Sequence, residues 1–337
     1  MCVYFRPIVR FDGPRPAEAI DLAGGPGWFS HAVRLSRDRA PQTVSVDEIP
    51  DDFRERLSAP RTPMAGLVFD RPRVMGILNV TPDSFSDGGL HQTASQAVQR
   101  AHEMAAAGAD IIDIGGESTR PGALTVPHEA EIARVEPVIT ALSRELATPI
   151  SIDTRKSSVA EAAVRAGAAL VNDVSGFTFD PMLARYCRDH GLPVCVMHAR
   201  GDPETMQSDP RYDDVLLDVY DFLAAQVAML VETGIPRSRI LVDPGIGFGK
   251  RIEHNLTILQ NIALFHGIGC AVLVGASRKR FIGTISGAET PAERTFGSVA
   301  VAQAVAAQGV QVVRVHDVSE TAQALAVWRA IAQGTYP

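Results

Sequence analysis

The sequence predicts an α/β fold, namely a (β/α)₈ TIM barrel with a small N-terminal extension. Three observations lead to this prediction. Eight short apolar runs recur between residues 73 and 316, and helical patterns separate them. The segment from residue 73 to the end of the chain is also close in length to the roughly 250 residues that such a barrel needs.

The eight apolar runs are predicted to be the strands of a parallel sheet. They are rich in β-branched residues and are continuous rather than alternating, which is typical of strands that are buried on both faces. In chain order they occupy residues 74–80, 110–115, 149–153, 169–173, 193–197, 240–244, 271–277 and 310–316.

The segments that follow these runs are predicted to be helices. They are rich in Ala, Leu, Glu and Arg, and several close on Gly, the usual residue just past a helix end. The predicted helices occupy residues 94–108, 129–146, 158–167, 180–191, 214–234, 255–265, 291–309 and 319–334. Alternating elements with right-handed crossovers close naturally into a barrel, and an open doubly wound sheet is the second choice.

Residues 1–72 lie outside this repeating pattern, and residues 73–337 are expected to form the catalytic domain. The first segment has a Gly/Pro break at 24–27 and a short helical candidate at 51–57. Its strand-like fragments are residues 4–9, 43–49 and 65–70. We expect a small appended element that packs beneath the barrel, where the last fragment leads into the first strand. The sequence assigns it no function.

Composition limits the classes of function. Apolar residues make up 46% of the 337-residue chain, enough for a large core, and the net charge of −7 gives no electrostatic support for nucleic-acid binding. The substrate is therefore expected to be small. The four cysteines show no CxxC pairing, and no run approaches the roughly 18 apolar residues of a membrane span. We expect a cytoplasmic protein with no membrane or nucleic-acid partner.

The predicted strands end in polar or otherwise functional side chains. In a (β/α)₈ barrel the carboxyl ends of all strands converge on one rim, where active sites lie. The residues concerned are Asn79, Asp113, Asp153, Asn172 with Asp173, Met197 with His198, Asp243, Ser277, and Arg314 with His316.

Two loops after the first strands carry candidate binding residues. The loop at 79–89 is rich in Gly, Ser and Asp and contains an apolar Phe85, so we expect a mobile lid rather than an ordinary turn. In the loop at 113–123, a Gly pair lets the backbone approach a ligand, and Arg120 suits phosphate or carboxylate. Arg120, together with Arg314 and His316, is expected to hold an anionic group.

Asp153, Asn172 and Asp243 come from the ends of three different strands. A single buried carboxylate at such a place is often a helix cap. Three converging carboxylate or carboxamide groups need a partner, because uncompensated burial of charge is costly. An aminopyrimidinone ring, such as a pterin or guanine, presents adjacent N–H and NH₂ donors that would satisfy them.

The Gly-rich stretch at 243–250 and the basic loop at 275–283 are the remaining candidates. The first does not match a P-loop, because Pro244 and Arg251 stand where Gly and Ser or Thr are required, and it lacks a dinucleotide fingerprint. Lys250 is equally compatible with a solvated rim and a ligand contact. The Ser-Arg-Lys sequence at 277–279 directly follows a predicted strand and is the better candidate for ligand contact.

Five segments together resemble the motifs of the dihydropteroate synthase family, and the resemblance covers residues 73–337. They are MGILNVTPDSFSDGG, DIGGESTRPGA, DPGIGFGK, GASRKRFIG and RVHDV, in this order. The resemblance implies condensation of 6-hydroxymethyl-7,8-dihydropterin pyrophosphate with p-aminobenzoate, giving 7,8-dihydropteroate and pyrophosphate in folate biosynthesis. It also implies Mg²⁺ at the pyrophosphate, competition by sulfonamides, and a homodimer formed through the Ala-rich final helices.

The resemblance also implies roles for individual residues. The pterin pocket would consist of Asp153, Asn172, Met197, Asp243 and Lys279. The pyrophosphate and metal site would consist of Asn79, Thr119, Arg120, Arg314 and His316, with Asn79 as the metal ligand. The p-aminobenzoate pocket would consist of Thr119, Pro121, Phe248, Ser277 and Arg278, with Phe85 and Asp87 added when the first loop closes. The expected catalytic residues are Asp87, Asp153, Lys279 and Arg314.

Two other functions compete with this one. A pterin-dependent methyltransferase would share the carboxylate and carboxamide pocket, but would have no need of the pyrophosphate cluster or the Ser-Arg-Lys loop. A catalytically silent pterin-binding paralogue would be favoured by loss of Asn79, Asp153, Lys279 or Arg314, and all four are present.

Overall fold

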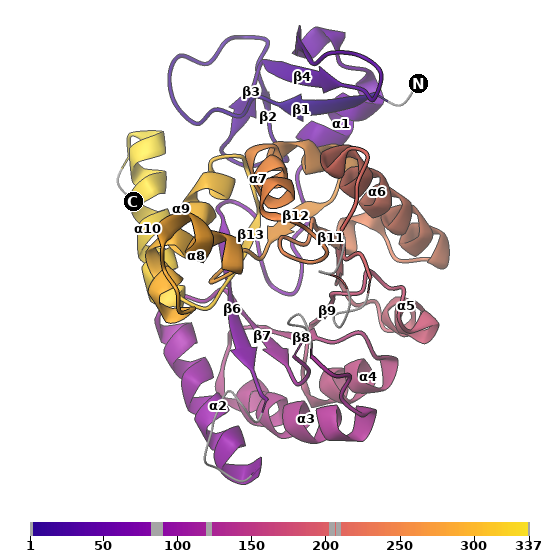
Figure 1. The fold of residues 1–337 in the computed structure, drawn as a ribbon, viewed down its shortest axis with the longest axis vertical. Coiled ribbons are helices and arrows are strands. Elements are labelled where there is room, and N and C mark those ends of the chain that lie inside the picture. The colour runs from indigo at the N-terminus through magenta and orange to yellow at the C-terminus, as the bar shows by residue number, and fades with distance from the viewer. Residues whose placement is uncertain (1–2, 82–89, 119–122, 202–205, 207–209, 336–337) are drawn as a thin grey trace.

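The computed structural model describes the chain except residues 1–2, 82–89, 119–122, 202–205, 207–209 and 336–337, and the side chains of 90–93. Its centre is a closed barrel of eight parallel strands in the order β6 to β13, with β13 pairing β6 (Figure 1). The predicted TIM barrel is therefore confirmed, and the open doubly wound sheet is excluded. The strands are β6 (Arg73–Asn79), β7 (Ile111–Gly115), β8 (Ile150–Asp153), β9 (Leu170–Asp173), β10 (Val194–Met197), β11 (Ile240–Asp243), β12 (Ala271–Val274) and β13 (Val312–Val315).

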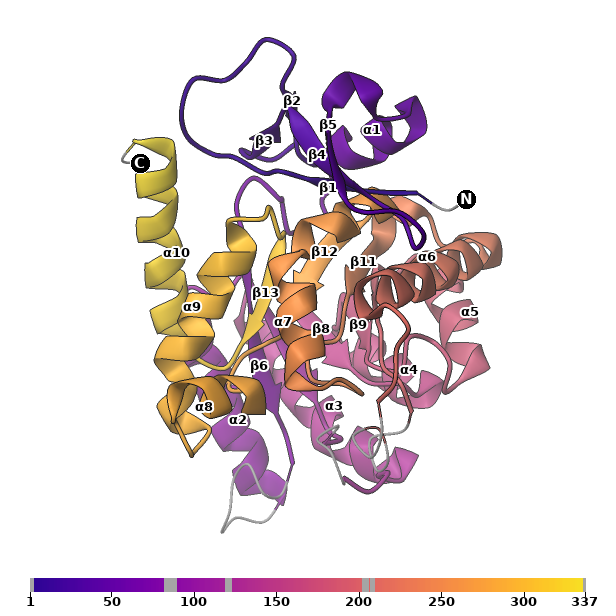
Figure 2. The same ribbon diagram turned by 45° about the horizontal axis from the view of Figure 1, so that its top comes forward.

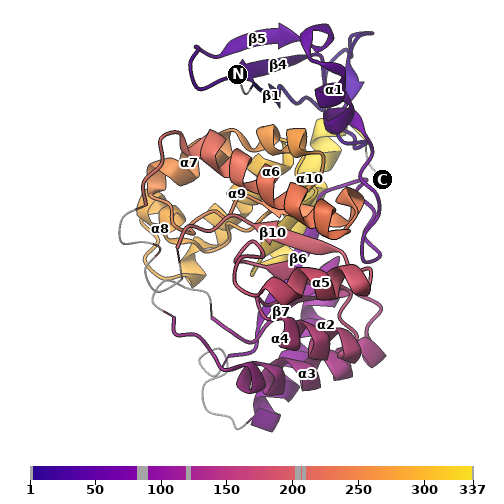
Figure 3. The ribbon, with the colours of Figure 1, turned by 90° about the vertical axis from the view of Figure 1, so that its right-hand side faces the viewer.

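Helices wrap around the outside of the barrel (Figure 3). They are α2 (Leu90–Ala106), α3 (His128–Glu145), α4 (Ser157–Ala166), α5 (Pro181–Asp189), α6 (Val215–Thr233), α7 (Ile252–Gln260), α8 (Arg280–Ser286), α9 (Thr295–Ala306) and α10 (Val318–Gln333). Local signals set their ends: the Asp214 carboxylate caps α6 by accepting from the N–H groups of Leu216 and Leu217, and Gly234 ends it with φ 110°.

Two predictions near the end of the chain were wrong in detail, and one helix was missed. The helix expected at 255–265 ends at Gln260, and a 3₁₀ helix follows at Ile262–Ile268. The strand expected to reach Ser277 ends at Val274, and the chain then turns sharply, with Arg278 at φ 57°. This turn starts α8, which the sequence pattern did not predict.

The N-terminal extension forms its own small sheet, with strand order β1-β4-β5. Its elements are β1 (Tyr4–Pro7), β2 (Ile20–Asp21), β3 (Trp28–Phe29), β4 (His31–Leu35), β5 (Gln42–Ser45), the 3₁₀ helix Val46–Glu48 and α1 (Asp51–Ser58). The sequence did not predict β2, β3 or β4. The strand expected at 65–70 is wrong, because only an isolated bridge between Met64 and Leu67 forms there.

The segment of the extension that follows α1 lies at the end of the barrel where the strands begin, whereas its small sheet lies outside the ring of strands, beside α6 and the 3₁₀ helix Ile262–Ile268 (Figures 1 and 2). The side chains of Met64, Leu67 and Phe69 pack inside that end against the first interior residues of the strands. Elsewhere, the Tyr4 hydroxyl donates to Asp221 of α6 at 2.9 Å. Only the last part of the extension therefore packs beneath the barrel, where the expectation placed it, and the small sheet packs beside the barrel.

The alternation of side chains along a strand determines which residues face the interior. The apolar layer at the start of the strands includes Ile111, Leu170, Leu241 and Val312. Two positions further on, the inward-facing residues are Asp113, Asn172, Asp243 and Arg314. The barrel therefore has an apolar floor and a polar layer above it, toward the carboxyl ends of the strands. Among the described residues no helix is long and apolar enough to cross a membrane.

Candidate active site

The polar layer is organised around Arg314 of β13. Its Nε donates to Asp113 Oδ2 of β7 at 2.6 Å, and its Nη2 donates to Asp153 Oδ2 of β8 at 2.6 Å. The Asn172 carboxamide of β9 donates to the same Asp113 oxygen at 3.1 Å. Four strands that are distant in the sequence thus place their side chains in one hydrogen-bonded group.

Asp243 and Lys279 extend this group on the side of β11 and β12. A Cβ at Gly275 would lie 3.7 Å from both Asp243 Oδ2 and Arg314 Cβ, so these two side chains flank the same glycine. Lys279 Nζ donates to the carbonyl of Ile246 and lies 4.6 Å from the centre of the Phe248 ring. We refer to Asp113, Asp153, Asn172, Asp243, Lys279 and Arg314 together as the mouth cluster.

The mouth cluster contains three carboxylates and two cations, and burial shifts the pKa values of several of them. Burial raises the pKa of Asp153 to about 7, with Arg314 opposing the rise and Asp113 adding to it. Burial also raises the pKa of Asp243 and lowers that of Lys279 to about 8, against the attraction of Asp243. Although burial disfavours its charge, Arg314 has a raised pKa because Asp113 and Asp153 contact it.

Ionisable groups with shifted pKa values that lie together at a barrel mouth are typical of a functional site. One further observation supports this: the second oxygen of Asp113, Oδ1, is buried and has no hydrogen-bond partner in the described part of the chain. A buried carboxylate oxygen without a donor is costly, and a bound ligand with N–H groups would supply one.

Asp113 is the member of the mouth cluster to which the sequence analysis gave no role. It was noted only as a strand end. The period of two from Ile111, whose side chain belongs to the apolar floor, would have placed Asp113 inside the barrel.

The other predicted contact residues divide into two groups around the mouth. Ser277 and His316 lie together, with the backbone N–H of His316 donating to Ser277 Oγ at 3.1 Å. Arg278 is engaged away from the mouth cluster, since its Nε donates to Asp317 at 3.1 Å. The predicted contact of Arg278 with p-aminobenzoate could therefore use only the part of the guanidinium that does not bond Asp317.

His198 and Lys250 do not line an open rim. Both are buried, and Lys250 Nζ lies 2.8 Å from His198 Nδ1 and 2.8 Å from the carbonyl of Gly245. Burial and Lys250 lower the pKa of His198 to about 2, so the ring is neutral and accepts the bond. A solvated rim position for Lys250 is therefore wrong, and Lys250 instead joins the loops after β10 and β11.

Other predicted residues lie around this centre or outside the described residues. Met197 is buried at the end of β10, and Phe248 lines a cavity of about 330 Å³. Asn79 lies at the end of β6, close to Asp153. A Cβ atom added at Gly115 would lie 3.8 Å from Asn79 Oδ1 and 3.7 Å from Asp153 Oδ2. Phe85, Asp87, Thr119, Arg120 and Pro121 fall outside the residues that the structure describes.

Asn79 is compatible with a magnesium site. Mg²⁺ is commonly held by one or two protein oxygens together with substrate phosphates and water, rather than by a cage of side chains. The described residues contain no group of three or more His, Cys, Asp or Glu side chains that could hold a metal ion. The Asn79 carboxamide near Asp153 therefore fits a metal ion held by few protein oxygens and by substrate phosphates, and not a cage of side chains.

Comparisons with known proteins agree with this site. The chain matches the family model described as "Pterin binding enzyme" over residues 75–316. It is 46% identical over 264 residues to the dihydropteroate synthase of Escherichia coli (strain K12), covering 78% of this chain and 93% of that protein.

Two solved structures are also similar. The Xanthomonas albilineans dihydropteroate synthase with 4-aminobenzoic acid is 46% identical, with a TM-score of 0.76 and coverage of 81% of this chain and 98% of that one. The same enzyme in complex with 7,8-dihydropteroate is 44% identical, with a TM-score of 0.74 and coverage of 82% and 100%.

A closed (β/α)₈ barrel with these acidic, carboxamide and cationic groups at its mouth is the scaffold of a pterin-binding enzyme, and this chain belongs to that family. Within the family it belongs with the dihydropteroate synthases, which are transferases. The family match begins at residue 75, so the N-terminal extension lies outside it.

Proposed function

We propose that this protein condenses 6-hydroxymethyl-7,8-dihydropterin pyrophosphate with p-aminobenzoate to give 7,8-dihydropteroate and pyrophosphate. The observation that carries the proposal is the mouth cluster, in which polar groups from β7, β8, β9 and β11 gather around the partly buried Arg314. The relationship to dihydropteroate synthases supports the same reaction.

The acceptors of the mouth cluster would hold the pterin. Asp153 and Asp243 offer carboxylate oxygens to the adjacent N–H and NH₂ donors of the ring, and Asn172 offers a carbonyl oxygen. The unpartnered Oδ1 of Asp113 adds another acceptor at the base of the site. Binding by several strand ends fixes the ring on a rigid scaffold, which keeps its methylene group in one position.

The reaction breaks the C–O bond between the pterin methylene and the pyrophosphate, and the electron pair leaves with pyrophosphate. Arg314 is preorganised by its two carboxylate partners to stabilise the negative charge that develops, and Arg120 is expected to assist. Mg²⁺ bound at Asn79 would neutralise charge on the pyrophosphate. The carboxylates of Asp153 and Asp243 offset positive charge on the pterin.

The arylamine nitrogen of p-aminobenzoate then forms the C–N bond and releases a proton. An arylamine is neutral and nucleophilic at pH 7, so a weak proton acceptor suffices. Phe248 presents an aromatic face beside Lys279, which suits the ring of the second substrate. Asp87 and Phe85 of the first loop are expected to complete this pocket.

A product assay tests the proposal directly. Purified protein incubated with the pterin pyrophosphate, p-aminobenzoate and Mg²⁺ should form dihydropteroate and pyrophosphate in equal amounts, and chelation of the metal should suppress both. Binding of the pterin without product would indicate the silent paralogue, and methyl transfer from a methylated pterin would indicate the methyltransferase.

The pH dependence of kcat/KM should be bell-shaped and narrow. Asp153 can accept hydrogen bonds through both of its oxygens only when ionised, so activity should rise as the pH passes its pKa of about 7. It should fall as Lys279 loses its proton near pH 8. Initial rates from pH 5.5 to 9.5 measure both limbs. Lys279→Arg should retain the acidic limb and lose the alkaline one, whereas an unchanged alkaline limb would exclude Lys279 as its source.

We also propose that the protein is a cytoplasmic homodimer, formed through α9 and α10. Phe296 on α9 is 87% exposed and Ile331 on α10 is 76% exposed, which is unusual for large apolar side chains. Phe296→Asp should therefore shift the sedimentation coefficient from dimer to monomer. Val231→Asp on α6, where the side chain is 38% exposed, is the matched control and should leave the dimer intact.

A further inference from the structure

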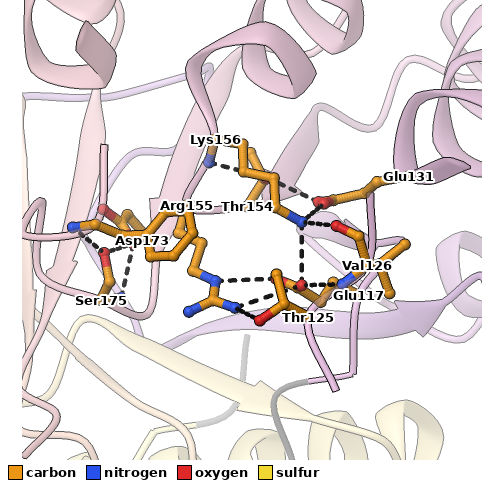
Figure 4. A network of polar contacts seen from close by, with 10 residues as sticks. Glu117, Thr125, Val126, Glu131, Thr154, Arg155, Lys156, Asp173 and Ser175 are labelled. Carbon is orange, nitrogen blue, oxygen red and sulfur yellow. Dashed lines mark hydrogen bonds and ion pairs between the residues drawn. The ribbon is translucent and has the colours of Figure 1, made fainter. Parts of the chain in front are cut away.

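A buried ionic network lies beside the mouth cluster and takes no part in the chemistry described above (Figure 4). Glu117 follows β7, and Arg155 and Lys156 follow β8. Arg155 Nε donates to Glu117 Oε2 at 3.0 Å, and Lys156 Nζ donates to Glu117 Oε1 at 3.0 Å. All three side chains are at least nine-tenths buried.

The network joins both stems of the loop after β7. Glu117 stands on the outgoing stem, and its Oε1 accepts the backbone N–H of Val126 on the returning stem at 2.8 Å. Lys156 Nζ donates to the Val126 carbonyl at 2.7 Å. Arg155 Nη2 donates to Thr125 Oγ1 at 3.0 Å. The stems are therefore held to each other and to the chain that follows Asp153.

Arg155 also reaches the loop after β9. Its guanidinium stacks on the Phe179 ring at 4.0 Å from the centroid. The Asp173 carboxylate fixes the start of that loop by accepting the N–H groups of Ser175 and Phe177 at 2.7 and 2.8 Å. One side chain thus connects three consecutive loops at the rim.

The position of Arg155 relates this network to the second substrate. Arg155, Phe179 and Phe248 all line the same cavity of about 330 Å³. Within the described part of the chain, Arg155 makes its hydrogen bonds and its ring contact with Glu117, Thr125 and Phe179 rather than with the mouth cluster, so its effect is expected on the Phe248 side of the site.

We propose that Arg155 is a positioning residue that determines the affinity for the arylamine substrate, by holding the loops after β7, β8 and β9 at fixed separations. This inference rests on the proposed function, because the arylamine is the substrate of that reaction. Arg155 lies outside the mouth cluster, and its proposed effect is on the affinity for only one of the two substrates.

The charged groups of this network are all paired, which supports a rigid arrangement of the loops that they join. Burial alone would raise the pKa of Glu117, but hydrogen bonds from Arg155, Val126 and Lys156 lower it below its ordinary value. Lys156 is fully buried, and Glu131 accepts its third bond at 2.5 Å. With every charge partnered, removal of Arg155 leaves Glu117 paired to Lys156, so an Arg155 variant can fold.

The test compares steady-state kinetics of Arg155→Met with those of the wild type. We expect KM for p-aminobenzoate to rise about 10-fold or more, because small displacements of a binding wall have large effects. The kcat and the KM for the pterin pyrophosphate should change less than about twofold, by the same reasoning, since the mouth cluster is untouched. Arg155→Lys should recover part of the loss. Arg165→Met, on the exposed face of α4, is the matched control and should change nothing.

A second variant and a second readout keep the proposal falsifiable. Thr125→Val removes one contact without changing a charge and should raise the same KM about threefold, a smaller step than loss of the whole guanidinium. Hydrogen exchange at residues 123–126 should accelerate in Arg155→Met. A folded Arg155→Met with an unchanged KM for p-aminobenzoate overturns the proposal, and so does an equal loss for both substrates, which would indicate a purely structural role.

Failure of the proposed function would appear differently. A wild-type protein that forms no dihydropteroate refutes the reaction itself. Hydrogen exchange then decides on the network alone, since unchanged exchange in Arg155→Met would show that Arg155 does not hold the loop stems.

Discussion

Asp153→Asn is expected to reduce kcat/KM by about 10²–10³-fold, the range seen when one charge-stabilising group is removed from an active site. The carboxylate offers two acceptor oxygens to the pterin, whereas Asn replaces one of them with an NH₂ donor that would face a donor of the substrate. The neighbouring bond from Arg314 Nη2, now 2.6 Å, can still be accepted by the remaining oxygen. The fold should therefore persist while the reaction is lost.

The same substitution should leave the free protein as stable or more stable at alkaline pH. Burial raises the pKa of Asp153 from 3.8 to about 7, so ionisation is harder in the folded chain than in the unfolded one. Stability from this group is present below the unfolded pKa and is lost as the pH rises to about 7. Asn avoids that loss and leaves Arg314 paired to Asp113, so Asp153→Asn should be more stable than the wild type at pH 8.5 and little changed at pH 4.

Kinetics and thermal unfolding at the two pH values test both statements. Asp189→Asn on α5, whose side chain is 56% exposed, is the control and should alter neither activity nor Tm. Near-normal kcat/KM in Asp153→Asn would remove Asp153 from the mechanism. A Tm that drops at alkaline pH would show that the ionised pair with Arg314 stabilises the fold.

The barrel and the composition of its rim could be predicted from sequence because both follow from local patterns. Continuous β-branched runs separated by helical patterns leave few topologies, and the fold places all carboxyl strand ends together. Asp153, Asn172, Asp243 and Arg314 therefore reach the same centre in the structure. The resemblance added roles that the pattern alone could not assign.

The parts that escaped prediction depend on contacts between distant segments. Lys250 is buried because it bonds the nearby carbonyls of Gly245 and Phe248 and also His198, which lies 52 positions away in the sequence. The two-residue strands β2 and β3 are too short to give a periodic signal. In the same way, the pairing of Glu117 with Lys156 spans 39 positions and is visible only in the fold.

Arg314→Met is expected to have the largest effect on both stability and activity. Arg314 is the counter-ion that contacts two buried carboxylates, Asp113 and Asp153, at 2.6 Å each. Removing one partner of a buried ion pair costs about 3–5 kcal/mol, because the charge that remains has no compensation. Catalysis should fall at least about 10³-fold, since the charge that would stabilise departing pyrophosphate is lost. Pyrophosphate affinity measured by calorimetry should fall as well.

A double variant separates these two effects of Arg314. Asp113→Asn in the Arg314→Met background removes one uncompensated charge, so it should recover part of the stability in urea unfolding without restoring activity. Arg100→Met breaks an exposed ion pair with Glu103 on α2 and should cost no more than about 0.5 kcal/mol. A loss of less than about 1 kcal/mol in Arg314→Met would show that Arg314 is not the counter-ion on which the two buried carboxylates depend.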